Sequence, residues 1–158
     1  MVQSPLNITL ASPEDTARRA VSLGSDLVPG DTVLLHGPVG AGKTHFARQL
    51  IQSLLVVPED VPSPTFTLVQ VYETTAGPLW HSDLYRIGSV FEIEELGLLE
   101  AFDAAICLVE WPDRLAELAP QDALNLTLEQ GETENARRLT AEWTADRWRP
   151  TLEKWVKP

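Results

Sequence analysis

A glycine loop between an apolar run and a helix-like segment constrains the fold of this chain most strongly. Residues 37–44 read GPVGAGKT and match the pattern G-x-x-x-x-G-K-[ST] in full. The preceding run, Thr32 to His36, is short and apolar, as in a strand that is buried on both faces. After the loop, apolar side chains recur at helical spacing from Phe46 to Leu54. A strand, a glycine loop and a helix in this order predict a cradle for the phosphate groups of a nucleotide.

The residue types in this loop fit that chemistry. Glycines permit positive φ and a close approach of the backbone, so that consecutive N–H groups can surround phosphate oxygens. Lys43 is predicted to reach the β- and γ-phosphates, and Thr44 to offer its hydroxyl to Mg²⁺. The predicted nucleotide-binding residues here are Gly37, Pro38, Val39, Gly40, Ala41, Gly42, Lys43, Thr44 and His45. The alternative is a glycine-rich turn that only caps a helix.

A carboxylate stands at the end of a second buried run. Residues Ala105 to Val109 are apolar, and Glu110 follows them directly. Bound Mg²⁺ usually retains several waters and takes one or two protein oxygens, so the site needs an acid near the glycine loop. Glu110 is predicted to be this acid on the metal side. A solvated carboxylate at a strand end is the alternative.

A polar cluster, HSDLYR, spans residues 81–86. On a strand, His81 and Asp83 point to the same side, so they are predicted to form a pair that faces the nucleotide. Asp83 would position water near the γ-phosphate, and Arg86 would pair with a phosphate or with an acid of the protein. The alternative is an Asp that caps a turn and an Arg in a structural ion pair.

The rest of the chain predicts an α/β domain. Further strands are expected at Leu6–Leu10, Phe66–Tyr72, Leu79–Leu84, Ala123–Glu129 and Arg138–Trp143. Further helices are expected from Pro13 to about Leu27, and at Ser89–Leu99, Asp113–Leu118 and Ala145–Val156. No repeat or boundary interrupts them, so residues 1–158 are predicted to form a single P-loop ATPase domain. Its predicted architecture is the three-layer P-loop NTPase fold, with a mostly parallel central sheet and helices on both faces.

Trp148, Leu152 and Trp155 recur at helical spacing in the last of these helices. This spacing predicts a helix whose apolar side packs on the sheet. A helix that binds a partner protein is the alternative.

Composition narrows the classes of function. The net charge of −11 works against tight nonspecific binding to nucleic acid, which depends mainly on Lys and Arg, so any RNA is expected to be held by another protein. No run approaches the ~18 uninterrupted apolar residues of a membrane span, and a cytoplasmic protein without membrane contact is predicted. The single cysteine, Cys107, lies in an apolar run and is predicted to pack as a small buried side chain rather than to act as a catalytic thiol.

The nucleotide is predicted to be ATP. A small GTPase would carry the guanine-recognising motif N-K-x-D, which the sequence lacks. A P-loop kinase of small metabolites is the alternative function, but it would normally show an arginine-rich lid. Arg137 and Arg138 are the only candidates for such a lid, and they lie in a strand-like segment.

Five motifs follow one another along the chain. They are GPVGAGKT at residues 37–44, SPTFTLV at 63–69, HSDLYR at 81–86, EELG at 94–97 and CLVEWP at 107–112. In this order and at these spacings, the sequence closely resembles the TsaE family, also called YjeE, over roughly Leu10 to Leu139. The resemblance implies a weak ATPase that acts with the TsaB and TsaD proteins in the synthesis of threonylcarbamoyladenosine (t6A) on tRNA, beside the anticodon. It also implies ATP and Mg²⁺ as ligands, a transfer step that belongs to TsaD, and contact with tRNA only through the complex.

The resemblance assigns roles by position. Lys43 and Asp83 match the positions needed for hydrolysis, and Thr44 and Glu110 match the Mg²⁺ positions. Matches to a switch-like segment and its neighbours are Ser63, Pro64, Thr65, His81, Tyr85, Arg86 and Trp111. Three residues fall where the family approaches the rest of the nucleotide, namely Ser12, Pro13 and Arg137.

One loop position departs from the family pattern. Pro38 stands where the family commonly has Asp. Because the N–H at this position can be dispensed with, phosphate binding is expected to survive. Pro38 cannot replace any hydrogen bond that an Asp side chain makes in the loops of the family.

Overall fold

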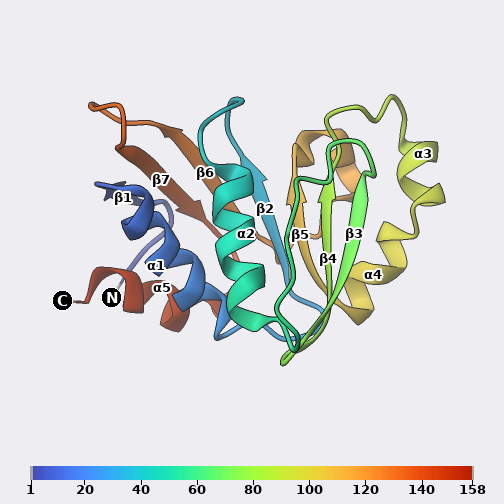
Figure 1. Cartoon of the computed structure of the whole chain (residues 1–158), viewed down its shortest axis with the longest axis horizontal. Coiled ribbons are helices and arrows are strands. Elements are labelled where there is room, and N and C mark those ends of the chain that lie inside the picture. Colours follow the sequence, from blue (N-terminus) through green and yellow to red (C-terminus); the bar gives the residue numbers. More distant parts are fainter. Residues whose placement is uncertain (1, 158) are drawn as a thin grey trace.

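The sheet of this protein is built from seven strands. The computed structural model describes residues 2–157, and the strands are β1 (Leu6–Leu10), β2 (Thr32–His36), β3 (Val69–Thr74), β4 (Gly77–Asp83), β5 (Ile106–Glu110), β6 (Leu124–Gln130) and β7 (Arg137–Glu142). In the sheet they lie in the order β1-β7-β6-β2-β5-β4-β3 (Figure 1). The strand that leads into the glycine loop, β2, therefore lies at the centre of the sheet.

The strands run in mixed directions, so the prediction of a mostly parallel sheet is wrong. β2 is parallel to both β6 and β5, and β5 is parallel to β4. The β3–β4, β6–β7 and β1–β7 pairs are antiparallel. The physical reason is the length of the connections, because β3–β4 and β6–β7 are hairpins and a short turn joins only antiparallel neighbours. Parallel pairing occurs where helices carry the chain back along the sheet, as between β4 and β5.

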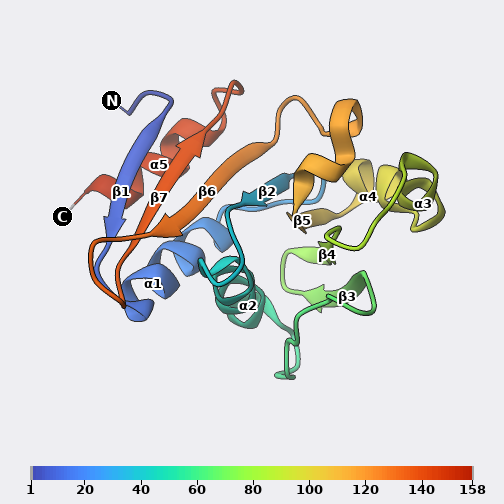
Figure 2. The same ribbon diagram turned by 90° about the horizontal axis from the view of Figure 1, so that it is seen from above.

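Helices cover both faces of the sheet, as predicted. They are α1 (Pro13–Gly24), α2 (Lys43–Leu54), α3 (Val90–Glu95), α4 (Leu98–Ala104), the 3-10 helix η1 (Pro112–Leu118) and α5 (Trp148–Val156). Leu35 faces the core formed with α1, α2 and α5, whereas its neighbour Leu34 faces the core formed with α3, α4 and η1. Side chains alternate along a strand, so one buried strand serves both cores. Figure 2 shows α2 and α4 on opposite sides of the sheet.

Several elements begin, end or divide at other positions than predicted. For example, α1 ends at Gly24 rather than near Leu27, and α5 begins at Trp148 rather than Ala145. The helix expected over residues 89–99 is two helices, because Gly97 adopts a left-handed φ of 78° that separates α3 from α4. β3 begins at Val69 rather than Phe66, directly after Leu68, which has a φ of 69°. Within residues 2–157, no helix combines the length and the apolar character needed to cross a membrane.

The C-terminal helix packs into the core, in agreement with the first of the two interpretations. Trp148, Leu152 and Trp155 are buried with the α1 and α2 side chains. The indole nitrogens of Trp148 and Trp155 donate hydrogen bonds to the carbonyl oxygens of Asp122 (2.8 Å) and Arg19 (3.1 Å). The apolar side of α5 is therefore used inside the protein.

Asp26 ties α5 to the end of α1. Its carboxylate accepts hydrogen bonds from Thr151 Oγ1 at 2.9 Å and Lys154 Nζ at 2.9 Å. Burial alone would raise the pKa of Asp26, but the hydrogen bonds from Lys154 and Thr151 and the Lys154 and Arg147 charges together lower the pKa below its ordinary value of 3.8. A lowered pKa in the folded state means that the stabilisation is complete above pH 3.8 and is lost as the pH falls through the folded-state value.

Asp26→Asn is therefore expected to reduce the free energy of unfolding by about 0.2–1 kcal/mol at pH 7, the range for a solvent-exposed ion pair. The difference from the wild type should shrink as the pH falls below 3.8, because the wild-type carboxylate then also becomes neutral. Urea unfolding curves at pH 7 and at a series of acidic pH values measure the loss of stability and its decrease with falling pH. A difference that stays constant across this range would show that the charge of Asp26 does not stabilise the fold.

Cys107 is buried within β5, as predicted. Burial raises the pKa of the Cys107 thiol to about 12. The native protein is therefore expected to leave Ellman's reagent unreacted at pH 8, since the thiolate is the reacting form. One thiol per chain should react once urea unfolds the protein, and rapid reaction of the native protein would contradict the buried position.

Candidate nucleotide-binding site

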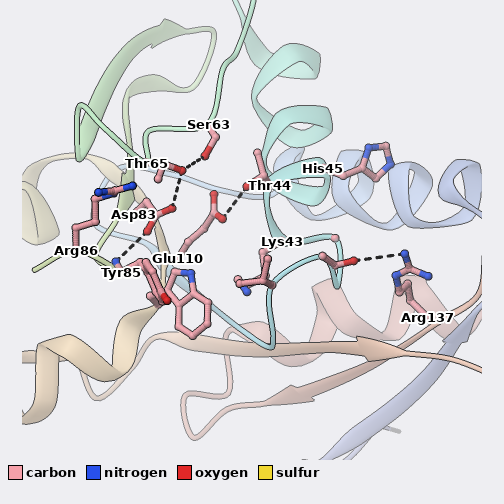
Figure 3. A pocket seen from close by; sticks show the side chains of 14 residues that line it. Lys43, Thr44, His45, Ser63, Thr65, Asp83, Tyr85, Arg86, Glu110 and Arg137 are labelled. Atoms are coloured by element: carbon pink, nitrogen blue, oxygen red, sulfur yellow. Dashed lines mark hydrogen bonds between the residues drawn. The ribbon is translucent and has the colours of Figure 1, made fainter.

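A cavity of about 530 Å³ opens where β2, β4 and β5 end at their carboxyl edge (Figure 3). Open α/β sheets commonly bind ligands at this edge. The residues that line it are Val39, Gly40, Gly42, Lys43, Thr44, His45, Ser63, Thr65, Asp83, Tyr85, Arg86, Glu110, Trp111 and Arg137. The structure thus brings together most of the predicted site residues, which come from five separate parts of the sequence.

The glycine loop requires glycine for two different reasons, a close backbone contact at one position and a positive φ at others. Gly37 has a φ of 133°, and a Cβ built on it would lie 2.1 Å from the carbonyl oxygen of Leu128 on β6, so only glycine fits there. Gly40 and Gly42 also have positive φ, but a Cβ on either would meet open space. Gly42 is the N-cap residue directly before α2, and no side chain of residues 2–157 caps this helix. The N–H groups of its first turn are left for a ligand.

Lys43 lies almost buried beside the loop, with 5% of its surface exposed. Its Nζ donates hydrogen bonds to the carbonyl oxygens of Gly37 and Pro38, the second at 3.0 Å. Nζ also lies 4.3 Å from the centroid of the Trp111 ring. Burial lowers the pKa of Lys43, and the nearby carboxylates, first of all Glu110, oppose this effect. The loop carbonyls and the carboxylates thus hold a cation at the cavity.

Trp111 reaches this cation through an uncommon backbone conformation. Its φ of 58° and ψ of 52° are left-handed. A conformation of this kind costs of order 1–3 kcal/mol for a residue other than glycine and persists where the surroundings enforce it. The indole packs against the ring of Tyr85, with ring centroids 4.8 Å apart. Tyr85 and Trp111 thus form an aromatic side of the cavity next to Lys43.

Thr44 and Glu110 meet across the cavity, as the sequence predicts. Thr44 Oγ1 donates a hydrogen bond to Glu110 Oε1 at 2.8 Å. The hydroxyl is at the start of α2, and the carboxylate is at the end of β5. Two oxygen ligands of this kind are the type that Mg²⁺ prefers, and the ion completes its shell with water and phosphate oxygens. The residues present therefore fit the ion.

His81 and Asp83 face the same side of β4 but do not form the predicted pair. His81 Nε2 lies 2.7 Å from Glu110 Oε2, behind the cavity lining. Asp83 instead accepts hydrogen bonds from the Tyr85 N–H at 2.9 Å and the Thr65 hydroxyl at 3.3 Å. The reason is spacing, because residues two apart on a strand are about 6.5 Å apart. Glu110, two residues beyond the register partner of His81 on β5, lies within reach of the imidazole instead.

The SPT segment joins the cavity through its hydroxyl groups. Ser63 Oγ and Thr65 Oγ1 are 2.6 Å apart, and Thr65 Oγ1 donates a hydrogen bond to Asp83. Pro64 lies outside the lining, and its carbonyl oxygen accepts the Leu68 N–H at 2.7 Å. Arg86, for which an acid or a phosphate was the expected partner, lies over the ring of Phe66 at 4.7 Å from the centroid and also lines the cavity.

A second cavity of about 180 Å³ adjoins the outer side of the glycine loop. Its lining consists of Pro13, Thr16, Ala41, Gly42, His45, Asn135 and Arg137. Arg137 lines both cavities and donates a hydrogen bond from Nε to the carbonyl oxygen of Ala41 at 3.2 Å. Thr16 and Asn135 were not predicted, because only the placement of α1 and β7 beside the loop brings them there.

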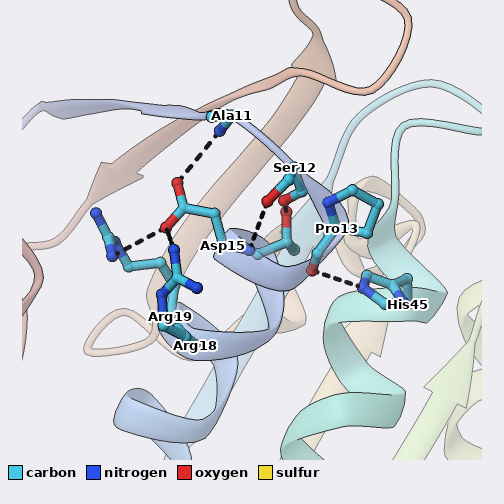
Figure 4. A network of polar contacts seen from close by, with 8 residues as sticks. Ala11, Ser12, Pro13, Asp15, Arg18, Arg19 and His45 are labelled. Carbon is cyan, nitrogen blue, oxygen red and sulfur yellow. Dashed lines mark hydrogen bonds and ion pairs between the residues drawn. The ribbon is translucent and has the colours of Figure 1, made fainter.

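Ser12 is used within the protein at the start of α1. Its Oγ accepts the Asp15 N–H at 3.1 Å, while the Asp15 carboxylate accepts the Ala11 N–H at 3.2 Å (Figure 4). This reciprocal arrangement satisfies two backbone donors at the helix start. Beside it, His45 Nε2 lies 3.2 Å from the Pro13 carbonyl oxygen. Ser12 thus fixes the helix start that borders the second cavity, rather than lining either cavity.

Known proteins resemble this chain over most of its length. Two relatives are described as tRNA threonylcarbamoyladenosine biosynthesis protein TsaE. The one from Rickettsia conorii is 39% identical over 131 residues, which cover 83% of this chain and 74% of the relative. The one from Bacillus subtilis is 37% identical over 132 residues, 82% of each chain. Among solved structures, Bacillus subtilis YdiB matches with a TM-score of 0.74 and 27% identity, over 98% of this chain and 95% of YdiB.

The resemblance that the five motifs predict is confirmed by the comparison with protein families. A family model described as threonylcarbamoyl adenosine biosynthesis protein TsaE matches residues 10–139. The match includes the residues that line both cavities and the whole of β2 to β6. It also takes in the last residue of β1 and the first three residues of β7. This chain belongs to the TsaE family.

Proposed function

We propose that this protein binds ATP on a P-loop NTPase fold, hydrolyses it slowly, and acts with the TsaB and TsaD proteins in the t6A modification of tRNA. The observation that carries the proposal is the convergence of Lys43, Thr44, Asp83 and Glu110 on one cavity beside the glycine loop. The family supplies the pathway, since relatives over most of the chain are named for t6A biosynthesis.

The glycine loop and Lys43 would bind the phosphates. The N–H groups at the start of α2 have no side-chain cap, and the positive end of the α2 dipole lies next to the glycine loop. Lys43 would exchange its hydrogen bonds to the Gly37 and Pro38 carbonyls for charged phosphate oxygens. Arg137, from the other side, holds the loop through the Ala41 carbonyl.

Thr44 and Glu110 would hold Mg²⁺. The Thr44 hydroxyl and the Glu110 carboxylate are already adjacent at 2.8 Å, and both are oxygen ligands. When bound, Mg²⁺ neutralises charge that develops on the phosphate oxygens. Asp83 would accept a hydrogen bond from the attacking water, since its carboxylate is anchored at the cavity by the Tyr85 N–H and the Thr65 hydroxyl.

The negative charge of this protein fits a role in which partner proteins, rather than the protein itself, bind the tRNA. With a net charge of −11, the protein would meet tRNA through TsaB and TsaD, and the transfer of threonylcarbamoyl would remain with TsaD. This work on tRNA would place the protein in the cytoplasm.

A metabolite kinase is less well supported. Arg137 is engaged with the glycine loop, and Arg138 lies 3.9 Å from Glu129 across the β6–β7 hairpin. Neither arginine extends from a lid.

A binding experiment tests the partnership. The purified protein is offered to an immobilised TsaB–TsaD pair with ATP, with ADP and without nucleotide. We expect retention that depends on the nucleotide, together with slow release of inorganic phosphate. Failure to bind in all three conditions would contradict the proposed partnership, and transfer of phosphate to a metabolite would favour the kinase instead.

A further inference from the structure

A histidine without solvent contact lies directly behind the cavity. His81 is 0% exposed in the middle of β4, on the side of the sheet that faces α2. Two of its neighbours in the sheet on that side are apolar, namely Leu79 two residues before it and Leu108, its partner on β5. The other two are polar, namely Gln70, its partner on β3, and Asp83 two residues after it. The buried imidazole therefore lies where the apolar core meets the polar residues of the cavity.

The polar atoms of this imidazole have one partner. His81 Nε2 lies 2.7 Å from Glu110 Oε2, and Nε2 is the donor because a carboxylate only accepts. His81 Nδ1 is buried and has no hydrogen-bond partner among residues 2–157. An unsatisfied buried polar atom costs roughly 1–3 kcal/mol. Stability of the core therefore does not explain this histidine, and its single hydrogen bond to Glu110 is what sets it apart from an aliphatic residue.

The hydrogen bond fixes the two oxygens of Glu110 in different roles. Oε2 accepts a hydrogen bond from His81 on the side away from the cavity, and Oε1 accepts a hydrogen bond from the Thr44 hydroxyl at the cavity. The terminal torsion of a free glutamate is broad, so an unheld carboxylate would turn and present either oxygen at varied angles. With Glu110 only 2% exposed, water cannot take the place of His81.

Resting on the proposed function, we propose that His81 is a positioning residue for the metal side of the site. It orients the Glu110 carboxylate so that Oε1 faces Thr44 and the Mg²⁺ that these two residues would hold. Side chains that orient a metal ligand in this way commonly change metal affinity by about 10- to 100-fold when they are replaced. His81 itself touches neither phosphate nor ion.

The test measures how much Mg²⁺ strengthens ATP binding, as the ratio of the dissociation constants for ATP in EDTA and in excess Mg²⁺. Calorimetry gives both values for each variant. His81→Leu, which fills the layer but cannot donate, is expected to reduce this ratio by about 10-fold while affinity in EDTA stays within about 2-fold of the wild type. His81→Gln should restore the ratio, because its amide nitrogen takes the place of Nε2.

Two further variants separate positioning from stability. Leu108→Ala removes apolar contacts beside His81 on β5 but keeps the His81–Glu110 hydrogen bond, so it should lower the melting temperature and leave the ratio unchanged. His81→Asn places its amide nitrogen where Nδ1 lies and falls short of Glu110, so it should behave as His81→Leu does. If His81→Leu does not fold, the ratio is compared between His81→Gln and His81→Asn. A higher ratio in His81→Gln supports the positioning role, and equal ratios contradict it.

The outcomes distinguish this inference from the function on which it rests. If the wild type binds no ATP, the proposed function fails. If the wild type gains affinity from Mg²⁺ and the Leu and Asn variants gain as much, His81 does not position the metal ligand. An equal loss in EDTA and in Mg²⁺, or a similar loss of the ratio in Leu108→Ala, would likewise overturn the inference in favour of a structural role.

Discussion

Lys43→Ala is expected to weaken ATP binding by about 100-fold, equivalent to about 2.7 kcal/mol. The Lys43 ammonium is nearly buried and is held at the cavity by the carbonyl oxygens of Gly37 and Pro38. On binding, it would replace these neutral acceptors by phosphate oxygens, and hydrogen bonds between charged groups are about twice as strong as neutral ones. Calorimetric titration with ATP in the presence of Mg²⁺ measures the change.

Lys157→Ala is the matched control for this experiment. Lys157 is exposed at the end of the chain and does not line the cavity. It removes the same charge from the protein, so its affinity for ATP should equal that of the wild type. An affinity of Lys43→Ala close to that of Lys157→Ala would contradict the assignment of the cavity as the phosphate site.

Asp83→Asn is expected to lower the rate of ATP hydrolysis by about 100-fold or more, the range for loss of a positioned proton acceptor. An amide has nearly the shape of the carboxylate, and its oxygen can still accept the Tyr85 N–H. The Thr65 hydroxyl can reverse its direction and donate elsewhere or accept from the amide nitrogen. ATP affinity should therefore stay within about 3-fold of the wild type, because the phosphate contacts are unchanged.

Single-turnover release of phosphate separates the rate of hydrolysis from binding. Asp103→Asn provides a control with an exposed carboxylate on α4, and its rate should match that of the wild type. If Asp83→Asn hydrolyses ATP at the wild-type rate, Asp83 serves only to hold the SPT segment and Tyr85. If it loses both binding and hydrolysis together, Asp83 acts through the shape of the cavity.

The central part of the site could be predicted from the sequence because short, continuous stretches of the chain contain the residues that form it. Residues 37–44 supply both the glycine backbone that can surround a phosphate and the cation of Lys43. The buried run before Glu110 predicts a strand that ends in a carboxylate. Parallel neighbours end at one edge of a sheet, so the approach of Glu110 to Thr44 follows once both strands are recognised.

Other features depend on the order and register of the strands, which no local pattern contains. The partner of His81 comes from another strand, because β5 lies parallel to β4 and carries Glu110 two residues beyond Leu108, which is opposite His81. The need for glycine at position 37 arises from the Leu128 carbonyl, more than ninety residues away along the chain. The mixed direction of the sheet follows from the β3–β4 and β6–β7 hairpins and from the antiparallel β1–β7 pair, and the sequence predicts these strands without giving their places in the sheet.

Measurement of t6A in cells tests the central claim most directly. Mass spectrometry of nucleosides gives the t6A content of total tRNA before and after depletion of this protein, and after expression of the wild type or of Lys43→Ala. The account predicts that t6A falls on depletion, that the wild type restores it, and that Lys43→Ala does not. A t6A content that stays normal in depleted cells would contradict the proposed role in tRNA modification, and full restoration by Lys43→Ala would contradict a role for its ATP site.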